Sequence, residues 1–352
     1  MKAVRMYKPL DLRVEEVEVP SPKDDEVLVK IYGVGVCGSD IPRITKTGAH
    51  VSPIIPGHEF SGEIVEVGKN VTKFKVGDRV TVPPLIPCYA CEWCKKGIYS
   101  LCTSYDYYGS RRDGAFAQYL NVVEGNLLKV PDNVSLLDAA TTDPAANAIH
   151  AITQANLKAG ETLVVYGAGA IGLFAIQVAK AHGAGQVIAI DMGDAKTDVA
   201  RKVGADVVID GAKENAIEAV RKATDGRMAD VVIDFTGAPP AQKNAIHLAR
   251  PMGRIVLLGI SHKPLDLSEY EVDLIMRGQL SVIGSWNSFT EPFPGNDWFE
   301  ALELFSEGKL SAEHMISHRL SLDEAPEIFK KIAEGGYFFN KIMFFPNGED
   351  FK

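Results

Sequence analysis

The chain has 352 residues, enough for about two domains at the usual ~150 residues per domain. Hydrophobic residues make up 46% and charged residues 24%, which excludes a disordered or fibrous chain. The net charge of −9 argues against nucleic acid or an anionic membrane surface as a partner. The N-terminus is charged and lacks an apolar signal segment, so we expect a cytoplasmic protein.

Residues 1–146 are predicted to form a β domain. Glu26–Ile31 and Gly62–Val67 alternate apolar and polar side chains, and Gly77-Asp78 sets up a further strand over Arg79–Val82. Prolines are frequent in this half and keep helices short. This texture indicates an antiparallel, partly barrel-like fold.

Residues 147–287 have a different texture, in which short β-branched runs alternate with segments of helical length. Strands spaced by helices of this length indicate βαβ units in a parallel sheet, and six strands make a full doubly wound sheet. The predicted strands are Leu163–Tyr166, Val187–Ile190, Val207–Ile209, Val231–Phe235, Ile255–Leu258 and Ser281–Ile283. The predicted helices between them include Ala195–Val203, Ala216–Ala223 and Pro240–Ala249.

Residues 288–352 form a C-terminal segment. A Pro/Gly-rich connection over Glu291–Gly295 is followed by two helical stretches and a final strand near Lys341–Phe345. We expect this segment to pack back on the first domain.

The stretch Thr162–Ala179 is 18 residues long and carries no charge, which meets the crude length for a membrane span. It contains Gly167, Gly169 and Gly172 in a GxGxxG pattern, with Ala170 and Ile171 between the last two glycines, directly after a predicted strand. In a dinucleotide-binding turn these glycines permit the tight turn, the approach of a pyrophosphate, and close helix packing. A buried parallel strand followed by a packed helix needs no charge, so we interpret the stretch as a cofactor site.

Asp191 strengthens this interpretation. It ends the next predicted strand, 24 residues after Gly167, where a carboxylate accepts hydrogen bonds from ribose hydroxyls. An acid at this position also repels a 2′-phosphate, which favours NAD over NADP, although Lys196 is nearby. The alternative is a Gly-rich packing turn followed by an aspartate that caps the next helix.

Four of the five cysteines form a compact cluster within residues 87–103. Four thiolates on a short lobe suit a closed tetrahedral zinc site with no position for substrate. An iron–sulfur cluster or unliganded thiols are the alternatives, but the ferredoxin-type fourth cysteine followed by proline is missing. The four are Cys88, Cys91, Cys94 and Cys102.

Cys37, the remaining cysteine, is followed 21 residues later by His58 and Glu59. A thiolate, an imidazole and a carboxylate on loops of the β domain can form an open catalytic metal site. The alternative is a buried cysteine and a hydrogen-bonded histidine without a metal.

Together these motifs resemble the zinc-dependent medium-chain dehydrogenase/reductase (alcohol dehydrogenase) family, over essentially the whole chain and in the right order. The pattern is Gly57-His58-Glu59-x2-Gly62-x5-Gly68, with Cys37, the four-cysteine lobe and the later GxGxxG. The resemblance implies a GroES-like β-barrel catalytic domain and a Rossmann domain. It also implies a catalytic Zn²⁺ held by Cys37, His58 and Glu59, with Asp143 as a further candidate ligand.

Hard oxygen ligands at Glu59 and Asp143 keep Mn²⁺ open as the catalytic metal. Within the family, several segments are similar to the polyol-phosphate dehydrogenases, such as the arabitol-phosphate and galactitol-1-phosphate 5-dehydrogenases. A phosphorylated substrate accounts for cations near the expected site, because arginine pairs with phosphate in a bidentate manner. The substrate candidates are Arg43, His50, Arg111 and Arg112.

The resemblance therefore implies an NAD-dependent oxidation of a secondary hydroxyl to the ketose phosphate, with Ser39 taking up the alcohol proton. Oxidation of threonine or of an unphosphorylated polyol such as sorbitol is the enzymatic alternative, suggested by Asp143-Pro144. A non-catalytic NAD-binding homologue is a third possibility, against which the presence of Cys37, His58 and Glu59 argues. The family resemblance also implies a homodimer or homotetramer, with Ser281–Ile283 as the subunit edge.

Overall fold

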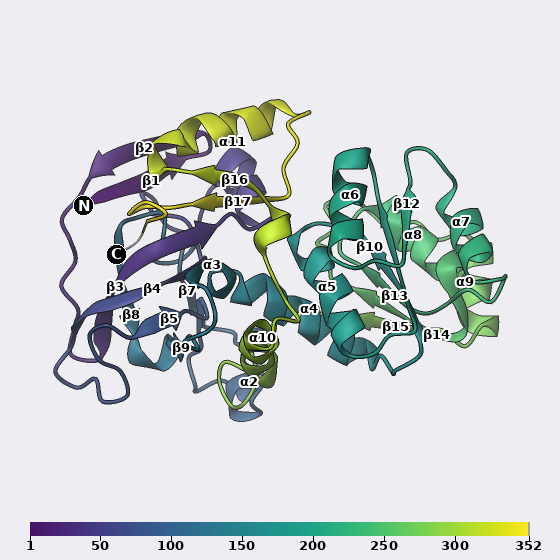
Figure 1. The fold of residues 1–352 in the computed structure, drawn as a ribbon, viewed down its shortest axis with the longest axis horizontal. Helices are drawn as coiled ribbons and strands as arrows, with labels where there is room; N and C mark the ends of the chain where they lie inside the picture. Colours follow the sequence, from purple (N-terminus) through teal and green to yellow (C-terminus); the bar gives the residue numbers. More distant parts are fainter. Residues whose placement is uncertain (351–352) are drawn as a thin grey trace. The chain divides into compact units, whose positions relative to one another are not determined.

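The computed structural model describes residues 1–350 and contains two compact units, each with its own sheet (Figure 1). Unit 1 comprises Met1–Asp143, Phe289–Ser306 and the chain from Ile316 onward. Unit 2 comprises Pro144–Ser288 and Glu307–Met315. The C-terminal segment is therefore shared between the units, because residues 307–315 belong to unit 2.

The main sheet of unit 1 has seven strands, with β3 at its centre. The strand order is β16-β17-β3-β4-β5-β9, and β8 also pairs with β3. The pairs formed within residues 1–146 are all antiparallel, as predicted, and β16 with β17 of the C-terminal segment is a parallel pair added at one end. The strands are β3 Glu26–Gly35, β4 Glu59–Val67, β5 Arg79–Thr81, β8 Tyr119–Val123, β9 Leu128–Lys129, β16 Ile316–Leu320 and β17 Lys341–Phe344.

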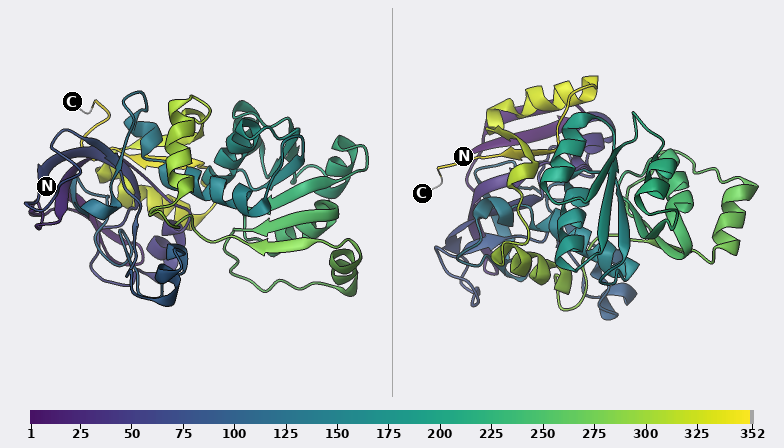
Figure 2. Two further views of the ribbon diagram at one scale, coloured as in Figure 1. Left: turned by 90° about the horizontal axis from the view of Figure 1, so that it is seen from below. Right: turned by 45° about the vertical axis from the view of Figure 1, so that its right-hand side comes forward.

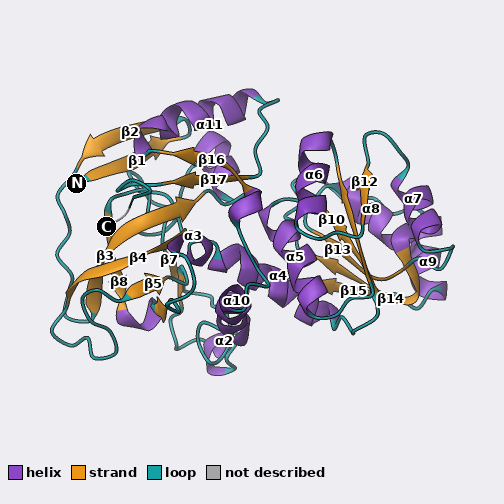
Figure 3. Cartoon of the chain, viewed as in Figure 1, coloured by secondary structure: helices purple, strands orange, loops and turns teal. Residues whose placement is uncertain are grey.

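Shorter elements complete unit 1, which is rich in strands and loops (Figure 3). Two small antiparallel sheets are formed by β1 with β2 and by β6 with β7. The elements are β1 Lys2–Lys8, β2 Asp11–Glu16, β6 Leu85–Ile86, β7 Asp106–Tyr107, α1 Asp40–Pro42, α2 Glu92–Lys95, α3 Leu136–Ala139, α10 Asn296–Ser306 and α11 Ala325–Glu334, with single turns η1 Arg43–Thr47, η2 Tyr99–Leu101, η3 Glu124–Asn126 and η5 Leu322–Glu324.

The core of unit 1 lies between the main sheet and the elements that cover it. Strand β3 is buried along most of its length, since it has sheet neighbours at both sides. Its side chains Val27, Val29 and Ile31 pack in one cluster with residues as distant in sequence as Phe329 and Phe344. The C-terminal segment thus supplies part of the core of unit 1.

Unit 2 is built on a six-stranded sheet in which every pair is parallel. The order β12-β11-β10-β13-β14-β15 is that of a doubly wound sheet, which confirms the predicted Rossmann-type fold. Each predicted strand is present. The strands are β10 Thr162–Tyr166, β11 Gln186–Asp191, β12 Val207–Asp210, β13 Ala229–Asp234, β14 Ala249–Leu257 and β15 Ser281–Gly284.

Helices lie on both faces of this sheet, with α5 and α6 on one side and α7, α8 and α9 on the other (Figures 1 and 2). Buried β-branched strands need this double cover, because neither face can be left in water. The helices are α4 Thr142–Ala155, α5 Ala170–Ala181, α6 Asp194–Lys202, α7 Ala216–Ala223, α8 Pro239–Leu248 and α9 Glu269–Arg277, and η4 Glu313–Met315 is a single turn.

The uncharged stretch Thr162–Ala179 is strand β10, the glycine turn and most of α5. Residues 172–179 of α5 are all buried against the sheet, so the missing charges reflect packing. None of the helices in residues 1–350 combines the length and apolar character that a membrane span requires.

Candidate metal centres and cofactor loop

The first candidate metal centre lies at one end of β3 and β4. A sulfur of Cys37, a ring nitrogen of His58 and a carboxylate oxygen of Glu59 all lie within 4.8 Å of one another. The register explains this convergence: Gly35 at the end of β3 pairs with Glu59 at the start of antiparallel β4. Cys37 follows that strand end and His58 precedes that strand start, so the sheet brings together residues 21 positions apart.

Asp40 contacts both Cys37 and His58 of this cluster and is completely buried. Its Oδ2 accepts a hydrogen bond from the backbone N–H of Cys37 at 3.2 Å, and its Oδ1 lies 3.4 Å from Nδ1 of His58. A carboxylate behind a histidine orients the ring and leaves the other nitrogen for a metal. Asp40 also pairs with Arg43, whose Nη1 donates to Oδ1 at 2.6 Å.

The electrostatics of the cluster fit a cation. Burial lowers the pKa of His58, but the negative charges of Asp40 and Cys37 outweigh it and hold that pKa well above its usual value. Burial, together with the charge of Glu59, raises the pKa of Asp143 to about 7. Both shifts arise from negative charge that is buried in this region, and a divalent ion bound there would offset that charge.

Ser39 and Asp143 lie beside the cluster in different ways. The Oγ of Ser39 donates to Sγ of Cys37 at 3.3 Å, within reach of any group that approaches that sulfur. Asp143 is buried near the start of α4, but it is not part of the group within 4.8 Å.

The second candidate centre is the four-cysteine lobe. The Sγ atoms of its four cysteines all lie within 4.8 Å of one another, and none of the four is in a disulfide. Backbone N–H groups lower the pKa of Cys91 to about 6, whereas burial raises the pKa of Cys94 to about 12. Four sulfurs held this close, with no oxygen donor among them, match a closed zinc site.

The glycine turn between β10 and α5 has the geometry of a dinucleotide-binding loop. Gly167 has φ +102°, a conformation that favours glycine. A Cβ at Gly172 would overlap the carbonyl oxygen of Gly167, so only glycine lets α5 start this close to the strand. By contrast, a Cβ at Gly169 would have no heavy atom within 4 Å, which leaves open space beside the N-terminus of α5.

Asp191 ends β11 and faces this turn. Its Oδ2 accepts from the N–H of Ala168 at 2.6 Å, so its carboxylate is held beside the glycine loop. Lys196 lies nearby, with its Nζ 4.0 Å from Oδ2. The parallel pairing of β10 with β11 places both strand ends at the same edge of the sheet, where ligands of such folds bind.

The four candidate cations differ in what they contact. Arg112 lies 3.5 Å from Asp106 and 3.9 Å from Glu26, and Arg43 is paired with Asp40. Arg111 stacks 4.5 Å from the ring centre of Tyr105, and its buried Nε has no hydrogen-bond partner among residues 1–350.

His50 is a fourth positive or potentially positive group in this region. Burial lowers its pKa, and so do the positive charges of Arg111 and Arg43. Arg43 and Arg111 are thus both close enough for their charges to act on His50, whereas Arg112 lies beside acidic side chains.

Three residues of the first centre were not assigned from the sequence. Asp40 carries a detectable signal, since it stands three positions after Cys37. Tyr107 packs edge-on against the His58 ring at 5.5 Å, and Lys341 forms a buried ion pair with Glu59. No local sequence pattern indicates the role of Lys341, because its partner Glu59 is 282 positions away in the chain.

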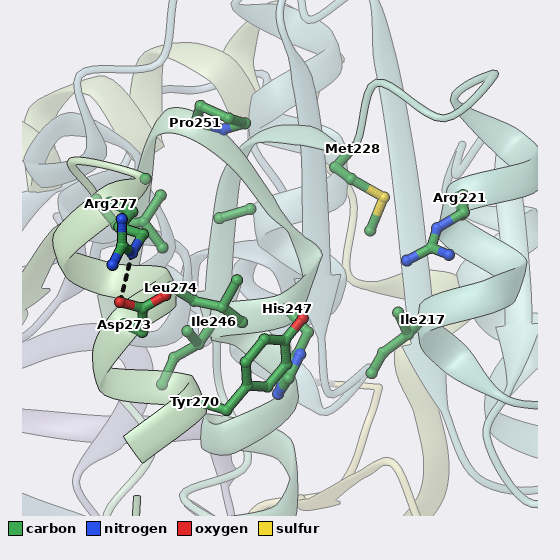
Figure 4. Close-up of a pocket in the computed structure, with 13 residues that line it drawn as sticks. Ile217, Arg221, Met228, Ile246, His247, Pro251, Tyr270, Asp273, Leu274 and Arg277 are labelled. Carbon is green, nitrogen blue, oxygen red and sulfur yellow. Dashed lines mark hydrogen bonds and ion pairs between the residues drawn. The ribbon is translucent and has the colours of Figure 1, made fainter. Parts of the chain in front are cut away.

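A cavity of about 380 Å³ lies elsewhere, in unit 2 beneath α9 (Figure 4). Its lining is largely apolar, and its two arginines are already paired, Arg277 with Asp273 at 2.6 Å and Arg221 with Glu218 at 3.4 Å. None of the predicted site residues lines it, so we leave it out of the candidate site.

Comparison with known proteins supports both units. The alcohol dehydrogenase GroES-like domain matches residues 23–132, and the zinc-binding dehydrogenase domain matches residues 170–307. The galactitol 1-phosphate 5-dehydrogenase of Escherichia coli (strain K12) is 39% identical over 323 residues, which are 92% of this chain and 93% of the relative. The sorbitol dehydrogenase of Bacillus subtilis (strain 168) is 32% identical over 353 residues, which are 99% of this chain and 98% of the relative.

Solved structures match over nearly the whole length. The crystal structure of galactitol-1-phosphate dehydrogenase from Escherichia coli has a TM-score of 0.93 at 38% identity, covering 98% of this chain and 100% of that chain. A short chain alcohol dehydrogenase from Escherichia coli CFT073, complexed with NADH, has a TM-score of 0.88 at 30% identity, covering 98% and 99%.

The glycine turn generates a first prediction. Gly172→Ala forces a methyl group into a backbone oxygen and should destabilise the fold by about 1–3 kcal/mol. Gly169→Ala adds a methyl group in open space, so it should leave the melting temperature unchanged and weaken NADH binding. Thermal unfolding and NADH fluorescence titration measure both. Equal melting temperatures for the two variants would contradict this assignment of the glycines.

The two metal centres generate a second prediction. Cys37→Ser and Cys102→Ser should each reduce bound zinc from two ions to one per chain, because each removes a ligand of a different centre. Only Cys102→Ser should also lower the melting temperature strongly, since the closed centre holds a lobe together. Atomic absorption and calorimetry are the measurements, with Zn²⁺ and Mn²⁺ added back separately after EDTA. Retention of two ions by either variant would refute the ligand assignment.

Proposed function

The chain belongs to the zinc-binding alcohol dehydrogenase family, and we propose that it oxidises a secondary hydroxyl of a phosphorylated sugar alcohol to the ketose phosphate, with NAD as hydride acceptor. The family membership makes it a zinc-type oxidoreductase of the alcohol and polyol dehydrogenases. The observation that carries the phosphate part is Arg111, a guanidinium with a buried, unsatisfied Nε beside two other positive or potentially positive groups.

In this proposal Cys37, His58 and Glu59 hold the catalytic metal, and Asp40 fixes the histidine ring. A divalent ion there supplies Lewis-acid stabilisation of the alkoxide as the hydroxyl loses its proton. The mixed sulfur, nitrogen and oxygen donor set leaves a position for substrate, unlike the closed four-cysteine centre, which holds a structural zinc.

Ser39 receives the proton of the substrate hydroxyl. Its Oγ is 3.3 Å from the Cys37 sulfur, so it reaches the side of the centre where the substrate oxygen binds. The relay histidine of related enzymes is replaced by Pro42 in this chain, so the proton leaves through water, ribose hydroxyls or His50.

The glycine loop of unit 2 binds the dinucleotide. Open space at Gly169 and the N–H groups at the start of α5 suit the pyrophosphate of NAD, which would supply the hydride acceptor when bound. The Asp191 carboxylate beside this loop disfavours a 2′-phosphate, which supports NAD over NADP. One solved relative of similar fold is complexed with NADH and another is bound to NADP, so the choice between the two cofactors rests on Asp191.

Arg111, Arg43 and His50 form the proposed phosphate site. Arg111 has a buried donor that lacks a partner within residues 1–350, and an anion would satisfy it. Arg43 is joined through Asp40 to the metal-ligating His58, so phosphate and metal sites share one buried carboxylate. Arg112 is left out, because it lies beside two acids, Glu26 and Asp106, whereas the acid beside Arg43, Asp40, is shared with His58.

Close backbone contacts keep this phosphate site near the metal. A Cβ at Gly109 would lie 2.7 Å from the carbonyl oxygen of Gly57, and one at Gly114 would overlap the same atom. The loop that carries Arg111 is therefore pressed against the residue that precedes His58. A sugar phosphate has its hydroxyl and phosphate groups separated by only a few bonds, which suits two adjacent sites.

An unphosphorylated polyol is the second candidate substrate. The similarity to a sorbitol dehydrogenase over 99% of this chain favours it, and Arg43 already has an acidic partner. The two candidate substrates differ in their interaction with Arg111. A phosphate group would pair with its guanidinium through a charge-assisted hydrogen bond, whereas a neutral polyol offers no negative charge.

We also propose that the chain forms a dimer through β15. This strand is at the edge of the unit 2 sheet, and Val282 and the following Trp286 are half-exposed. An exposed edge strand with apolar side chains is a template for pairing with a second copy, and a two-fold axis is the commonest arrangement.

The substrate assignment predicts a specific kinetic change. Arg111→Gln should lower kcat/KM for galactitol or arabitol phosphates about 10- to 100-fold, as expected for a charge-assisted hydrogen bond. The same variant should not change kcat/KM for the unphosphorylated polyols. Arg13→Gln is the matched control, because Arg13 is an exposed arginine paired with Asp11. Equal wild-type kcat/KM for a polyol and its phosphate would refute phosphate recognition.

The dimer predicts a change in mass. Val282→Lys places a charge in the proposed strand pairing and should convert the wild-type assembly to a smaller species in light scattering after gel filtration. Val76→Lys, at an equally exposed valine of unit 1, should leave the mass unchanged. If Val282→Lys keeps the wild-type mass, β15 is not the interface.

A further inference from the structure

Glu59 forms a buried ion pair that the proposed reaction does not use. Its partner is Lys341, whose side chain is only 2% exposed, and Glu59 is equally enclosed. The Nζ of Lys341 donates to Oε2 of Glu59, and it also donates to the carbonyl oxygen of Val36 at 3.2 Å. A lysine is rarely buried this completely unless it neutralises a charge.

Three adjacent strands, β4, β3 and β17, meet at this point of the sheet. The middle strand, β3, has a glycine there, which leaves room for the ion pair. Gly35 of β3 is paired with Glu59 of β4 on one side and with Met343 of β17 on the other. A Cβ at Gly35 would lie 2.6 Å from Oε2 of Glu59 and 2.6 Å from Cε of Lys341. The lysine therefore crosses β3 above a glycine to reach the carboxylate.

Glu59 is also one of the three donors of the metal centre. The same carboxylate thus faces an ammonium group in this structure and would face a divalent ion in the loaded protein. Two cations that share one carboxylate reduce each other's hold on it, and this coupling is reciprocal. An oxygen that is tied to an ammonium group is also less free to approach the metal.

We propose that Lys341 is a positioning residue that competes with the metal for Glu59 and so keeps a coordination position open for the substrate. The inference rests on the proposed metal at Cys37, His58 and Glu59. With Cys37, His58 and one oxygen of Glu59 as donors the fourth position of a catalytic zinc stays open, and it would be filled if the second Glu59 oxygen also bound the metal. Lys341 thereby lowers the affinity of the centre for the metal and leaves a coordination position accessible to the substrate.

The test is the affinity of the catalytic ion in Lys341→Met, measured by competition with a chromophoric chelator. Removing Lys341 leaves Glu59 with the metal as its only countercharge, so the catalytic Zn²⁺ should bind between about 5-fold and 150-fold more tightly. Turnover should fall, because the closed centre excludes the substrate. Lys341→Arg should restore both values towards wild type. The ion of the four-cysteine lobe is an internal reference whose release should not change.

Two further variants separate this role from a purely structural one. Gly35→Ala disturbs the ion pair without changing any charge and should also tighten zinc binding. In a Glu59→Gln background, Lys341→Met should have no effect on zinc affinity, because the contested carboxylate is gone. Equal or weaker zinc binding in Lys341→Met would overturn the inference.

Failure of the proposed function has a different signature. If Cys37→Ser keeps both ions, the metal is not at the proposed centre and the function is wrong. If Cys37→Ser loses one ion but Lys341→Met does not tighten the binding of that ion, only the competition is wrong.

Discussion

A charge buried in a protein is stable only beside an opposite charge, and this constraint organises the metal centre of unit 1. Asp40 is fully buried and is held by Arg43, by His58 and by the Cys37 backbone. Glu59 is buried and is held by Lys341. Loss of one partner would leave a charge uncompensated, so these residues are mutually dependent. A cation bound at the proposed centre would satisfy the same constraint, and its binding would then be coupled to folding.

Glycines solve the second problem, which is how to bring backbones close enough for these contacts. Gly109 presses the Arg111 loop against the segment before His58, and Gly35 leaves room for Lys341 to cross β3. In unit 2, Gly172 lets α5 begin against the turn at Gly167. At each position a side chain would occupy space that a neighbouring group needs, so the small residue serves the geometry of the site.

Much of the fold was predictable because burial imposes periodicity on short segments. The continuous apolar runs of unit 2 identified all six strands, and the GxGxxG pattern directly after β10 located the cofactor turn. Cys37, His58 and Glu59 were identifiable because metal binding restricts residue types. The parallel pairing of β16 with β17 was not predictable, since the residue pattern of a strand does not show whether its neighbour runs parallel or antiparallel to it. Arg111 and Arg112 could not be told apart, because neighbours in sequence met different partners in space.

The sequence by itself determined the family, the two sheets, the four-cysteine lobe and the donor types of the candidate metal centre, because each depends on residue type or on spacing along the chain. Only the tertiary structure decided which charges are neutralised. It joined Glu59 to Lys341 across 282 positions, paired Arg112 with two acids, and left the Arg111 donor without a partner among residues 1–350. The physical reason is that electrostatic energy depends on distance in space and on burial, and neither is a property of the chain until it folds.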